Sequence, residues 1–224
     1  MGAAYRHVVF DLDGTLVDSA ADLSAAVNAG LAVFDRPPLS RDVIVGFVGN
    51  GTRKLVEGSL RASGLAPTEE AIDRAYAVFR GHYDAHLLDQ TRAYPGVDSL
   101  LAALAANGVV LSVLTNKLQR PSERILAGLG LAGRFRAVLG GDDETARKPN
   151  PAGLLRLVAE AGILPAEALL VGDSDVDVAT ARAAGVPVCG VTWGFQSPER
   201  IRGAGATWLV ERPEEILVAC VRPA

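Results

Sequence analysis

Cysteine is scarce in this sequence, and neither of its two cysteines belongs to a recognisable motif. Cys189 and Cys220 form no CxxC pair and no zinc-ligand spacing, and they are too few for a disulfide framework. This scarcity excludes a disulfide-stapled scaffold and favours a reducing compartment, so the cytoplasm is the expected location. Cys189 lies in the apolar run Val-Pro-Val-Cys-Gly-Val, which predicts a buried side chain rather than a nucleophile.

Long apolar runs and an excess of positive charge are also absent. No apolar stretch is long enough to span a bilayer, and the first residues lack the charged and apolar segments of a secretory signal. The formal net charge of -4 gives no reason to expect nucleic acid or an anionic membrane as a partner. An anionic substrate would therefore have to be attracted locally, by a metal ion or by placed cations.

The sequence does contain a regular alternation of strand and helix patterns. Its 224 residues, 49% of them hydrophobic, suffice for one sizeable core with a smaller appendage. Short β-branched runs alternate with helical patterns, which predicts an α/β fold with a doubly wound, Rossmann-like parallel sheet covered by helices on both faces. The expected strands are 7–10, 109–114, 137–139, 168–171 and 186–191, with a short strand near Thr207 before a final helix.

One region interrupts this alternation. From Ser19 to about Asp89 the patterns are helical and no strand is evident. The stretch Ser19-Ala-Ala-Asp22 resembles a capping box at the start of the first of these helices. We expect an all-helical cap domain at residues 18–89, inserted into a core domain formed by residues 1–17 and 90–224.

The segment Asp11-Leu12-Asp13-Gly14-Thr15 is the strongest chemical signal. It places two carboxylates at the carboxyl end of the first expected strand, where doubly wound sheets bind their ligands. Gly14 allows the chain to turn sharply away. Asp and Gly are also common turn formers, so this segment alone favours a turn and a catalytic site about equally.

Three further polar segments follow expected strands. Thr115-Asn116-Lys117 places a hydroxyl and an amide at a strand-to-helix junction, which suits phosphate and equally suits an N-cap. Lys148 lies between a turn-rich segment and a proline-initiated helix, which together fix the position of its backbone. A lone lysine is, however, more often a surface charge. Asp173 ends a strand and Asp177 lies about one helical turn later. This pair can hold a divalent ion, or it can interact with the helix dipole.

The order and spacing of these four segments resemble the motifs of the haloacid dehalogenase superfamily. The insertion directly after the first motif is similar to that of members with a helical cap. The resemblance implies that Asp11 is a nucleophile and that Asp13 acts as general acid and then general base. It also implies that Thr115 and Lys148 hold the transferring phosphoryl group. Three further residues of these motifs are expected at the substrate: Gly14, Thr15 and Asn116.

The resemblance further implies a Mg²⁺ cofactor. Its expected ligands are Asp11, the backbone carbonyl of Asp13, and Asp173, with Asp177 in support. Electrostatics agrees, because a carboxylate that approaches a phosphate dianion to 4 Å faces a repulsion of about 8 kcal/mol at an effective dielectric constant of 20. Mg²⁺ and Lys148 together would supply three positive charges against this repulsion.

The residues also bear on the reaction and its substrate. Dehalogenases of this superfamily lack an acid two residues after the nucleophile, so Asp13 favours phosphoryl transfer. Within the superfamily the chain is most similar to phosphoglycolate phosphatases, through Val48-Gly49-Asn50-Gly51, Tyr94-Pro95-Gly96-Val97 and Thr115-Asn116-Lys117. This similarity implies hydrolysis of a small phosphorylated metabolite, 2-phosphoglycolate, to glycolate and phosphate.

The expected cap contains candidates for substrate contact. Gly49, Asn50 and Gly51 form a loop that we expect to face the site and close over a small acid. Arg53 either contacts a substrate anion or is simply an exposed residue in the first turn of a helix. Gly194-Phe195-Gln196 stands where phosphoglycolate phosphatases often carry Gly-Tyr-Asn, so it departs from the pattern close to the expected site.

Alternative functions remain open at this level. A sugar phosphomutase would use the same acid and base, and a broader phosphatase would act on sugar phosphates, nucleotides or pyrophosphate. Phosphonate hydrolysis needs a cap lysine, and Lys54 is the only lysine in the expected cap. A receiver-like binding switch or a scaffold without activity is the non-enzyme alternative, although receiver domains lack a helical cap.

Overall fold

A six-stranded parallel sheet forms the centre of the computed structural model, which describes residues 5–221. The strand order is β5–β4–β1–β6–β7–β8. The strands are β1 (His7–Phe10), β4 (Val110–Leu114), β5 (Ala137–Leu139), β6 (Ala168–Gly172), β7 (Val188–Val191) and β8 (Trp208–Val210). Phe10 of β1 pairs with Val113 of β4 on one side and with Val171 of β6 on the other. The chain therefore winds outward from β1 in both directions, and the predicted doubly wound sheet is confirmed.

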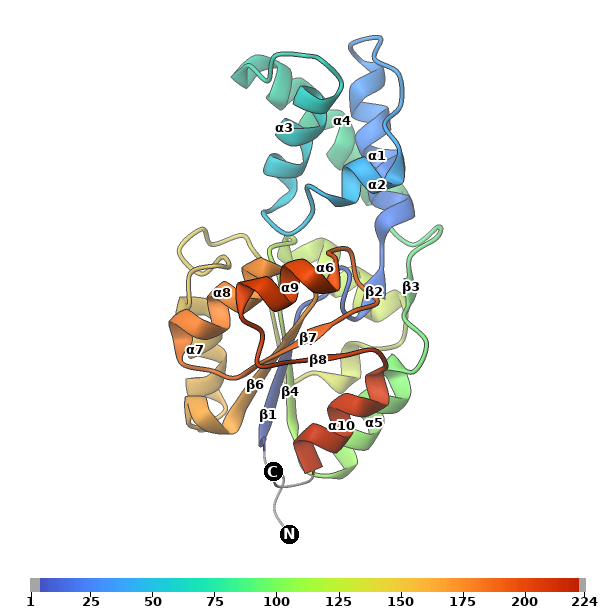
Figure 1. Cartoon of the computed structure of the whole chain (residues 1–224). Helices are drawn as coiled ribbons and strands as arrows, with labels where there is room; N and C mark the ends of the chain where they lie inside the picture. The colour runs from blue at the N-terminus through green and yellow to red at the C-terminus, as the bar shows by residue number, and fades with distance from the viewer. Residues whose placement is uncertain (1–4, 222–224) are drawn as a thin grey trace.

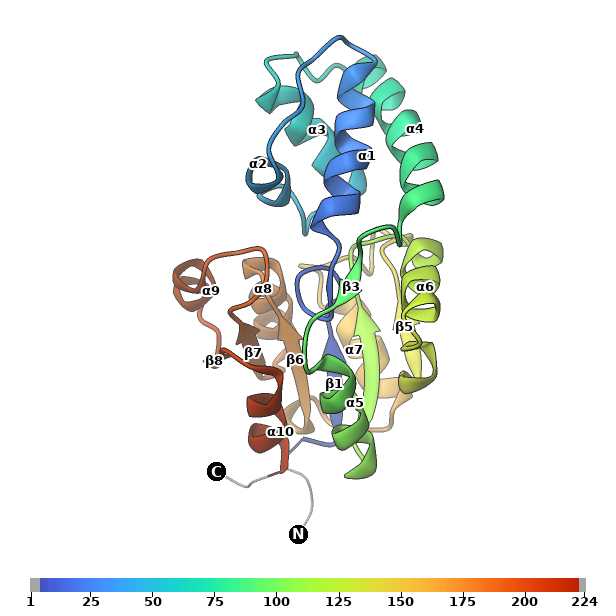
Figure 2. The ribbon, with the colours of Figure 1, turned by 90° about the vertical axis from the view of Figure 1, so that its right-hand side faces the viewer.

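Helices cover both faces of this sheet, as Figures 1 and 2 show. One face carries α5 (Val97–Ala106), α6 (Gln119–Gly128) and α10 (Pro213–Val221), and the other carries α7 (Ala152–Glu160), α8 (Asp175–Ala184) and α9 (Pro198–Ala204). Alternate side chains of β1 serve the two faces, since Val8 and Phe10 belong to one buried cluster and Val9 to the other. Single-turn 3₁₀ helices precede β5 and β6, at η1 (Ala132–Arg134) and η2 (Pro165–Glu167). Within the described residues, no helix combines the length and apolar character that crossing a membrane would need.

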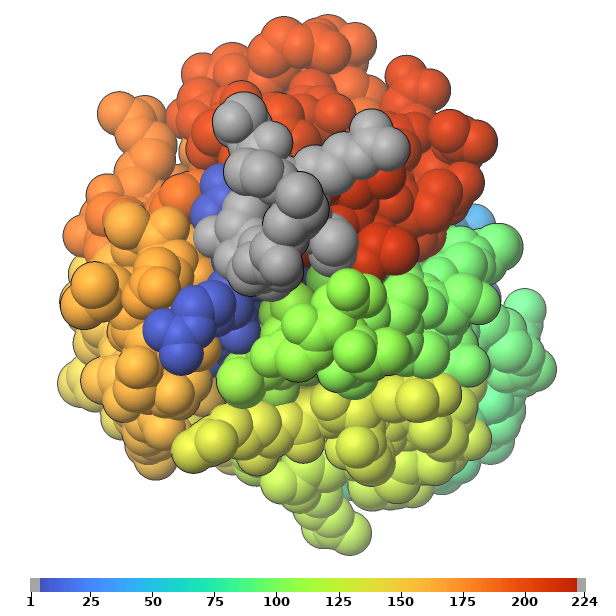
Figure 3. Space-filling model, turned by 90° about the horizontal axis from the view of Figure 1, so that it is seen from below, coloured from blue at the N-terminus to red at the C-terminus, as the bar shows by residue number. Residues whose placement is uncertain are grey.

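The two ends of the core differ. Seen from the end opposite the cap, the start of the chain lies between the α5 segment, in green, and the α7 segment, in orange (Figure 3). At the carboxyl ends of the strands lie four further helices (Figures 1 and 2). They are α1 (Ala20–Ala32), α2 (Arg41–Val45), α3 (Thr52–Ala62) and α4 (Glu69–His86). They form the helical cap, in which Leu23, Val27, Ile72 and Phe79 are buried.

The chain enters and leaves the cap through a two-stranded antiparallel ribbon. β2 (Val17–Asp18) pairs with β3 (Arg92–Ala93), and the sequence patterns did not predict this pair. The domain limits expected after residues 17 and 89 lie in or next to this ribbon. The paired crossings place the cap directly over the carboxyl edge of the sheet.

The predicted capping box at the start of α1 is wrong. Ser19 precedes the helix without a side-chain capping bond, and its hydroxyl instead donates to the Asp13 carboxylate at 2.5 Å. Asp22 accepts from the backbone N–H groups of Gln90 and Thr91, at 3.0 and 2.8 Å, and from the Thr91 hydroxyl at 2.7 Å. Distant partners have replaced the local cap, and the buried Asp22 carboxylate ties the two crossings together.

Candidate active site

A cavity lies between the carboxyl edge of the sheet and the cap. It encloses about 540 Å³ of space between the protein atoms, including its open mouth. The sheet edge contributes acidic, basic and amide side chains to its lining: Asp11, Asp13, Thr115, Asn116, Lys117, Lys148, Asp173, Ser174 and Gln196. The cap contributes glycine and mostly apolar residues: Leu23, Val48, Gly49, Gly51, Thr52 and Leu55.

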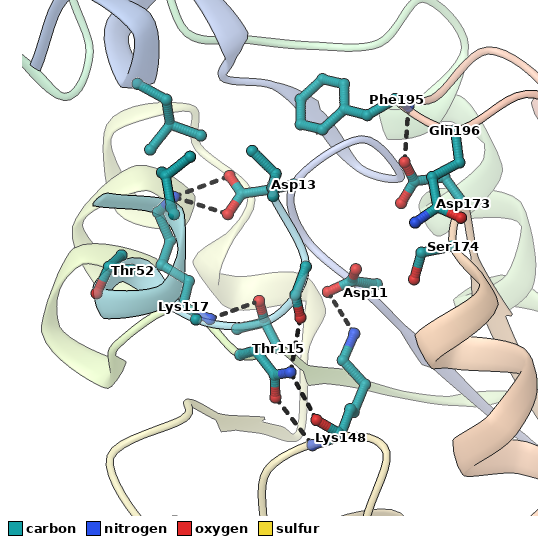
Figure 4. A pocket seen from close by; sticks show the side chains of 16 residues that line it. Asp11, Asp13, Thr52, Thr115, Lys117, Lys148, Asp173, Ser174, Phe195 and Gln196 are labelled. Carbon is teal, nitrogen blue, oxygen red and sulfur yellow. Dashed lines mark hydrogen bonds and ion pairs between the residues drawn. The ribbon is translucent and has the colours of Figure 1, made fainter. Parts of the chain in front are cut away.

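Asp11 and Lys148 form a buried ion pair at the floor of this cavity. Asp11 directly follows β1, and its backbone N–H donates to the Val171 carbonyl at 2.9 Å, which fixes it to β6. The Lys148 ammonium lies 2.8 Å from Asp11 Oδ1 and 2.6 Å from Asp177 Oδ1 (Figure 4 shows the pair with Asp11). Burial raises the pKa of Asp11 to about 6, with Lys148 opposing the shift and Asp177 adding to it. The nucleophile candidate and its cation are thus held together with little exposure to solvent.

Asp173 lies beside this pair at the end of β6. Its two oxygens accept from the Thr15 hydroxyl at 3.2 Å and from the Phe195 backbone N–H at 2.7 Å. A side chain at Gly14, which has a φ of 83°, would collide with the Asp173 carboxylate. Burial, followed by the negative charges of Asp11 and Asp177, raises the pKa of Asp173 well above its usual range.

This carboxylate group fits a divalent cation. One oxygen from each of Asp11, Asp173 and Asp177 lies within 4.8 Å of the others, and all three residues are buried. Lys148 supplies a single positive charge against three carboxylates, so negative charge remains uncompensated, and it adds to burial in raising the pKa values of Asp11 and Asp173. Both oxygens of Asp177 already accept, from Lys148 and from Ser174. Asp11 and Asp173 line the cavity, whereas Asp177 lies behind it, fully buried. The first two are therefore the more accessible ligands, and Asp177 orients Lys148.

Asp13 points to a different partner. Lys117 Nζ donates to both of its oxygens, at 2.9 and 2.7 Å, and Figure 4 shows the carboxylate directed toward Lys117 and away from Asp11. Only 2% of the Lys117 side chain is exposed. Burial opposes a charge on Lys117, but the nearby Asp13 outweighs it and leaves the lysine pKa above its ordinary value. Asp13 and Lys117 therefore form a second buried ion pair in the same cavity.

Thr115 and Asn116 organise the chain around these pairs. The Thr115 hydroxyl accepts from the Lys117 backbone N–H at 3.2 Å. The Asn116 amide donates to the carbonyls of Gly49 and Lys148, at 2.7 and 2.8 Å, and its oxygen accepts from the Lys148 N–H at 2.8 Å. Asn116 therefore fastens the Lys148 loop to the sheet edge and the cap loop to the core.

The structure brings together only part of the set that the sequence indicated. Gly49 and Gly51 line the cavity, whereas Asn50 and Arg53 line a separate recess of the cap. Arg53 donates to Asp73 at 2.6 Å and to Glu69 at 2.5 Å, both within the cap. Thr15 does not line the cavity, but its hydroxyl donates a hydrogen bond to Asp173, which does.

Sequence reasoning gave no role to several lining residues. Lys117 was visible in the Thr-Asn-Lys segment, but its buried pairing with Asp13 spans 104 residues. Phe195 and Gln196, at the departure from Gly-Tyr-Asn, also line the cavity. Gln196 bonds Asp175 through both its amide atoms. The departure from the pattern was the signal that could have identified these two.

With this geometry in view, comparison with known families identifies the class. Residues 8–191 match the family described as haloacid dehalogenase-like hydrolases. The chain belongs to this family, since the match spans well over half of its length. The four motifs at the strand ends, the α/β core and the helical cap agree with that membership.

Individual relatives narrow the comparison. The chain is 44% identical to a phosphoglycolate phosphatase of Rhodospirillum rubrum, over 90% of this chain and 85% of the relative. It is 42% identical to phosphoglycolate phosphatase 1 of Pseudomonas aeruginosa, over 95% and 78%. A crystal structure described as a predicted phosphoglycolate phosphatase from Haemophilus somnus superposes with a TM-score of 0.90 at 32% identity, covering 96% of this chain and 97% of the other. The resemblance and the enzyme class expected from the sequence are confirmed.

Proposed function

We propose that this protein is a magnesium-dependent phosphatase that hydrolyses 2-phosphoglycolate to glycolate and phosphate. The observation that carries the proposal is the buried Asp11–Lys148 pair, with Asp173 beside it, on the floor of a small cavity. The names of the relatives support the substrate, because phosphoglycolate phosphatases of two organisms align over most of this chain. A cavity closed by a cap suits a small ester.

The first chemical step would be attack of an Asp11 oxygen on phosphorus. The bond between phosphorus and the glycolate oxygen breaks, and the leaving oxygen receives a proton from Asp13, which must enter this step as the carboxylic acid rather than as the ion-paired carboxylate. Lys148 would offset the charge of the phosphoryl oxygens, with the Thr115 hydroxyl as a further donor. Mg²⁺ held by Asp11, Asp173 and the backbone carbonyl of Asp13 would neutralise charge and align the phosphate with the nucleophile.

The second step would release the enzyme from its aspartyl-phosphate. Asp13, now ionised, accepts a proton from a water molecule as the water oxygen attacks phosphorus. The bond between phosphorus and Asp11 breaks, and phosphate leaves with Asp11 restored as a carboxylate. The water-excluding cap suits this sequence of steps, because it limits the solvent that reaches the intermediate.

The test is phosphate release from a panel of small esters, with Mg²⁺ and with chelator. The panel contains 2-phosphoglycolate, sugar phosphates, nucleotides and pyrophosphate. A magnesium-dependent preference for 2-phosphoglycolate supports the proposal. Magnesium-dependent turnover that prefers other esters overturns the substrate and keeps the chemistry. No turnover of any ester, with conversion between sugar phosphate isomers, favours a mutase, and no reaction at all favours a scaffold.

A further inference from the structure

Lysine is used sparingly in this chain, and its placement is selective. The 22 basic side chains comprise nineteen arginines and only three lysines: Lys54, Lys117 and Lys148. Lys54 is exposed on the cap and pairs with Glu57. The other two are buried in the same cavity, with 2% of each side chain exposed. Burying an ammonium is costly unless it is paired, so two buried lysines at one cavity call for separate explanations.

The two buried lysines serve opposite sides of the reacting bond. Lys148 is committed to Asp11 and Asp177, on the side where the proposed mechanism places the phosphoryl group. Lys117 is committed to Asp13, the group that would protonate the leaving oxygen. Among the described residues that line the cavity, these are the basic side chains, and Arg53 faces the cap instead. A negative charge on the leaving group therefore meets Lys117.

The surroundings of Lys117 strengthen its interaction with an anion. Its ammonium lies 4.8 Å from the centroid of the Tyr83 ring, which belongs to cap helix α4. Such a contact favours the cation without using a donor, so its three N–H groups remain available for acceptors. Two of them bond the two oxygens of Asp13. Exclusion of solvent makes each of these charge-assisted bonds stronger than on the surface.

We propose that Lys117 is the specificity-determining residue that binds a carboxylate on the carbon next to the ester oxygen. This inference rests on the proposed phosphatase function. In 2-phosphoglycolate one carbon separates the ester oxygen from the carboxylate, so a cation beside the general acid is within reach of that carboxylate. Lys117 then divides its donors between one oxygen of Asp13 and the substrate. The second oxygen of Asp13 becomes free to turn to the leaving oxygen.

A pair of esters tests this role. 2-Phosphoglycolate and 2-hydroxyethyl phosphate have the same length, and only the first carries a carboxylate. Steady-state kcat/KM is measured for both with saturating Mg²⁺, in the wild type and in Lys117→Met, Lys117→Gln and Lys117→Arg. Lys54→Met is the matched control, because it removes an exposed cap lysine that does not line the cavity.

We expect loss of charge at Lys117 to lower kcat/KM for 2-phosphoglycolate by about 100-fold. For 2-hydroxyethyl phosphate, whose leaving group carries no charge, the loss should be at least ten times smaller. Arginine should retain much of the preference, and the control should retain all of it. An equal loss for both esters in the uncharged variants overturns the inference and leaves Lys117 as a positioning residue for Asp13. A wild type that hydrolyses both esters equally well overturns it without any variant, while the phosphatase proposal stands. A wild type that hydrolyses neither ester overturns the proposed function as well.

Discussion

The two walls of the cavity use different physical means. The sheet edge carries buried charges in pairs, Asp11 with Lys148 and Asp13 with Lys117, on backbone fixed by parallel strands. The cap wall presents glycine and apolar surface, and keeps its charged pairs, such as Arg53 with Asp73, on exposed faces. Buried charge pairs impose strict geometry and are costly to disrupt, whereas exposed pairs contribute little.

This contrast indicates that the sheet edge and the cap have different roles. Rigid elements suit groups that must stay aligned with a reacting phosphorus, since small misplacements there are costly. The polar contacts of the cap with the core include the Asn116 bond to the Gly49 carbonyl, the Tyr83 ring over Lys117, and the Arg124 bond to the Asp84 carbonyl. Opening of the cap would break these contacts, while the Asp11–Lys148 pair lies wholly within the core and would stay in place. The chain crosses between core and cap at residues 17–19 and 88–91, where the ribbon and the Asp22 bonds lie, so we expect the hinge of the cap at these crossings.

The largest effect should follow from removing the nucleophile. Asp11→Asn should lower kcat for every ester by about 10⁵-fold or more, because no aspartyl-phosphate can form. The fold should persist, since Lys148 keeps Asp177 as a partner and one of three buried negative charges disappears. Rapid-quench detection of the phosphoenzyme, with circular dichroism, checks both statements. Asp98→Asn, on exposed α5, is the control, and activity near the wild type in Asp11→Asn would remove Asp11 as the nucleophile.

Removing the charge of Lys148, at the same sheet edge, should lower both activity and stability. Lys148→Met leaves Asp11 and Asp177 buried without their partner, so the free energy of unfolding should fall by about 3–5 kcal/mol. Turnover should drop by about 10²–10³-fold, as for loss of one oxyanion donor. Urea unfolding and steady-state kinetics measure the two effects. A stable but inactive variant would show that Lys148 matters for catalysis alone.

The grouping of polar side chains at the sheet edge was largely predictable, for a physical reason. Parallel strands all end at the same edge, so residues that follow β1, β4 and β6 must meet there whatever the helices do. That logic brought Asp11, Thr115 and Asp173 together from sequence. It says nothing about which partner a side chain chooses. Ser19 and Asp22 had a local partner in the capping box and took distant ones, and that choice depends on packing that no local pattern encodes.

The cap was predictable only as a set of helices. Helical spacing identified the cap helices, but it does not say which side of α3 faces the cavity. Thr52 and Leu55 line the cavity, whereas Arg53 and Lys54 line a separate recess. Whether Arg53 faces the site or the neighbouring helix depends on how α3 and α4 pack, and the sequence does not show this. In the structure Arg53 faces α4, where it pairs with Glu69 and Asp73.

The charge imbalance of the sheet edge should appear as a pH dependence of stability. The pKa of Asp11 is raised from 3.8 to about 6, and that of Asp173 is raised well above its usual range. The folded state therefore binds more protons than the unfolded chain, so metal-free protein should lose stability as the pH rises from about 4 through 6 and beyond. Mg²⁺ should remove most of this loss, and Asp173→Asn should reduce both the loss and the Mg²⁺ effect.

Thermal melts at pH 5 to 8, with Mg²⁺ and with chelator, measure this prediction. The difference in Tm between the wild type and Asp173→Asn is the informative quantity, because the contribution of His7 is the same in both proteins and cancels. Burial lowers the pKa of His7 to about 4, so its contribution to stability is complete at neutral pH and is lost as the pH falls below about 6.5. This pH dependence is opposite in sign to that of Asp11 and Asp173. We expect Mg²⁺ to raise the wild-type Tm by a few degrees at pH 8 and by less at pH 5. An equal shift at both pH values would contradict the predicted imbalance.

The smallest effect should come from the cap wall. Arg53→Ala breaks two exposed pairs within the cap, with Glu69 and Asp73. We expect kcat/KM for 2-phosphoglycolate to change less than about threefold and Tm to change little, as for other exposed pairs. The same assay on Lys117→Met gives the contrast. A tenfold rise in KM for Arg53→Ala would instead mean that cap closure carries Arg53 from its present partners to the substrate, and the cap wall would then share in anion recognition.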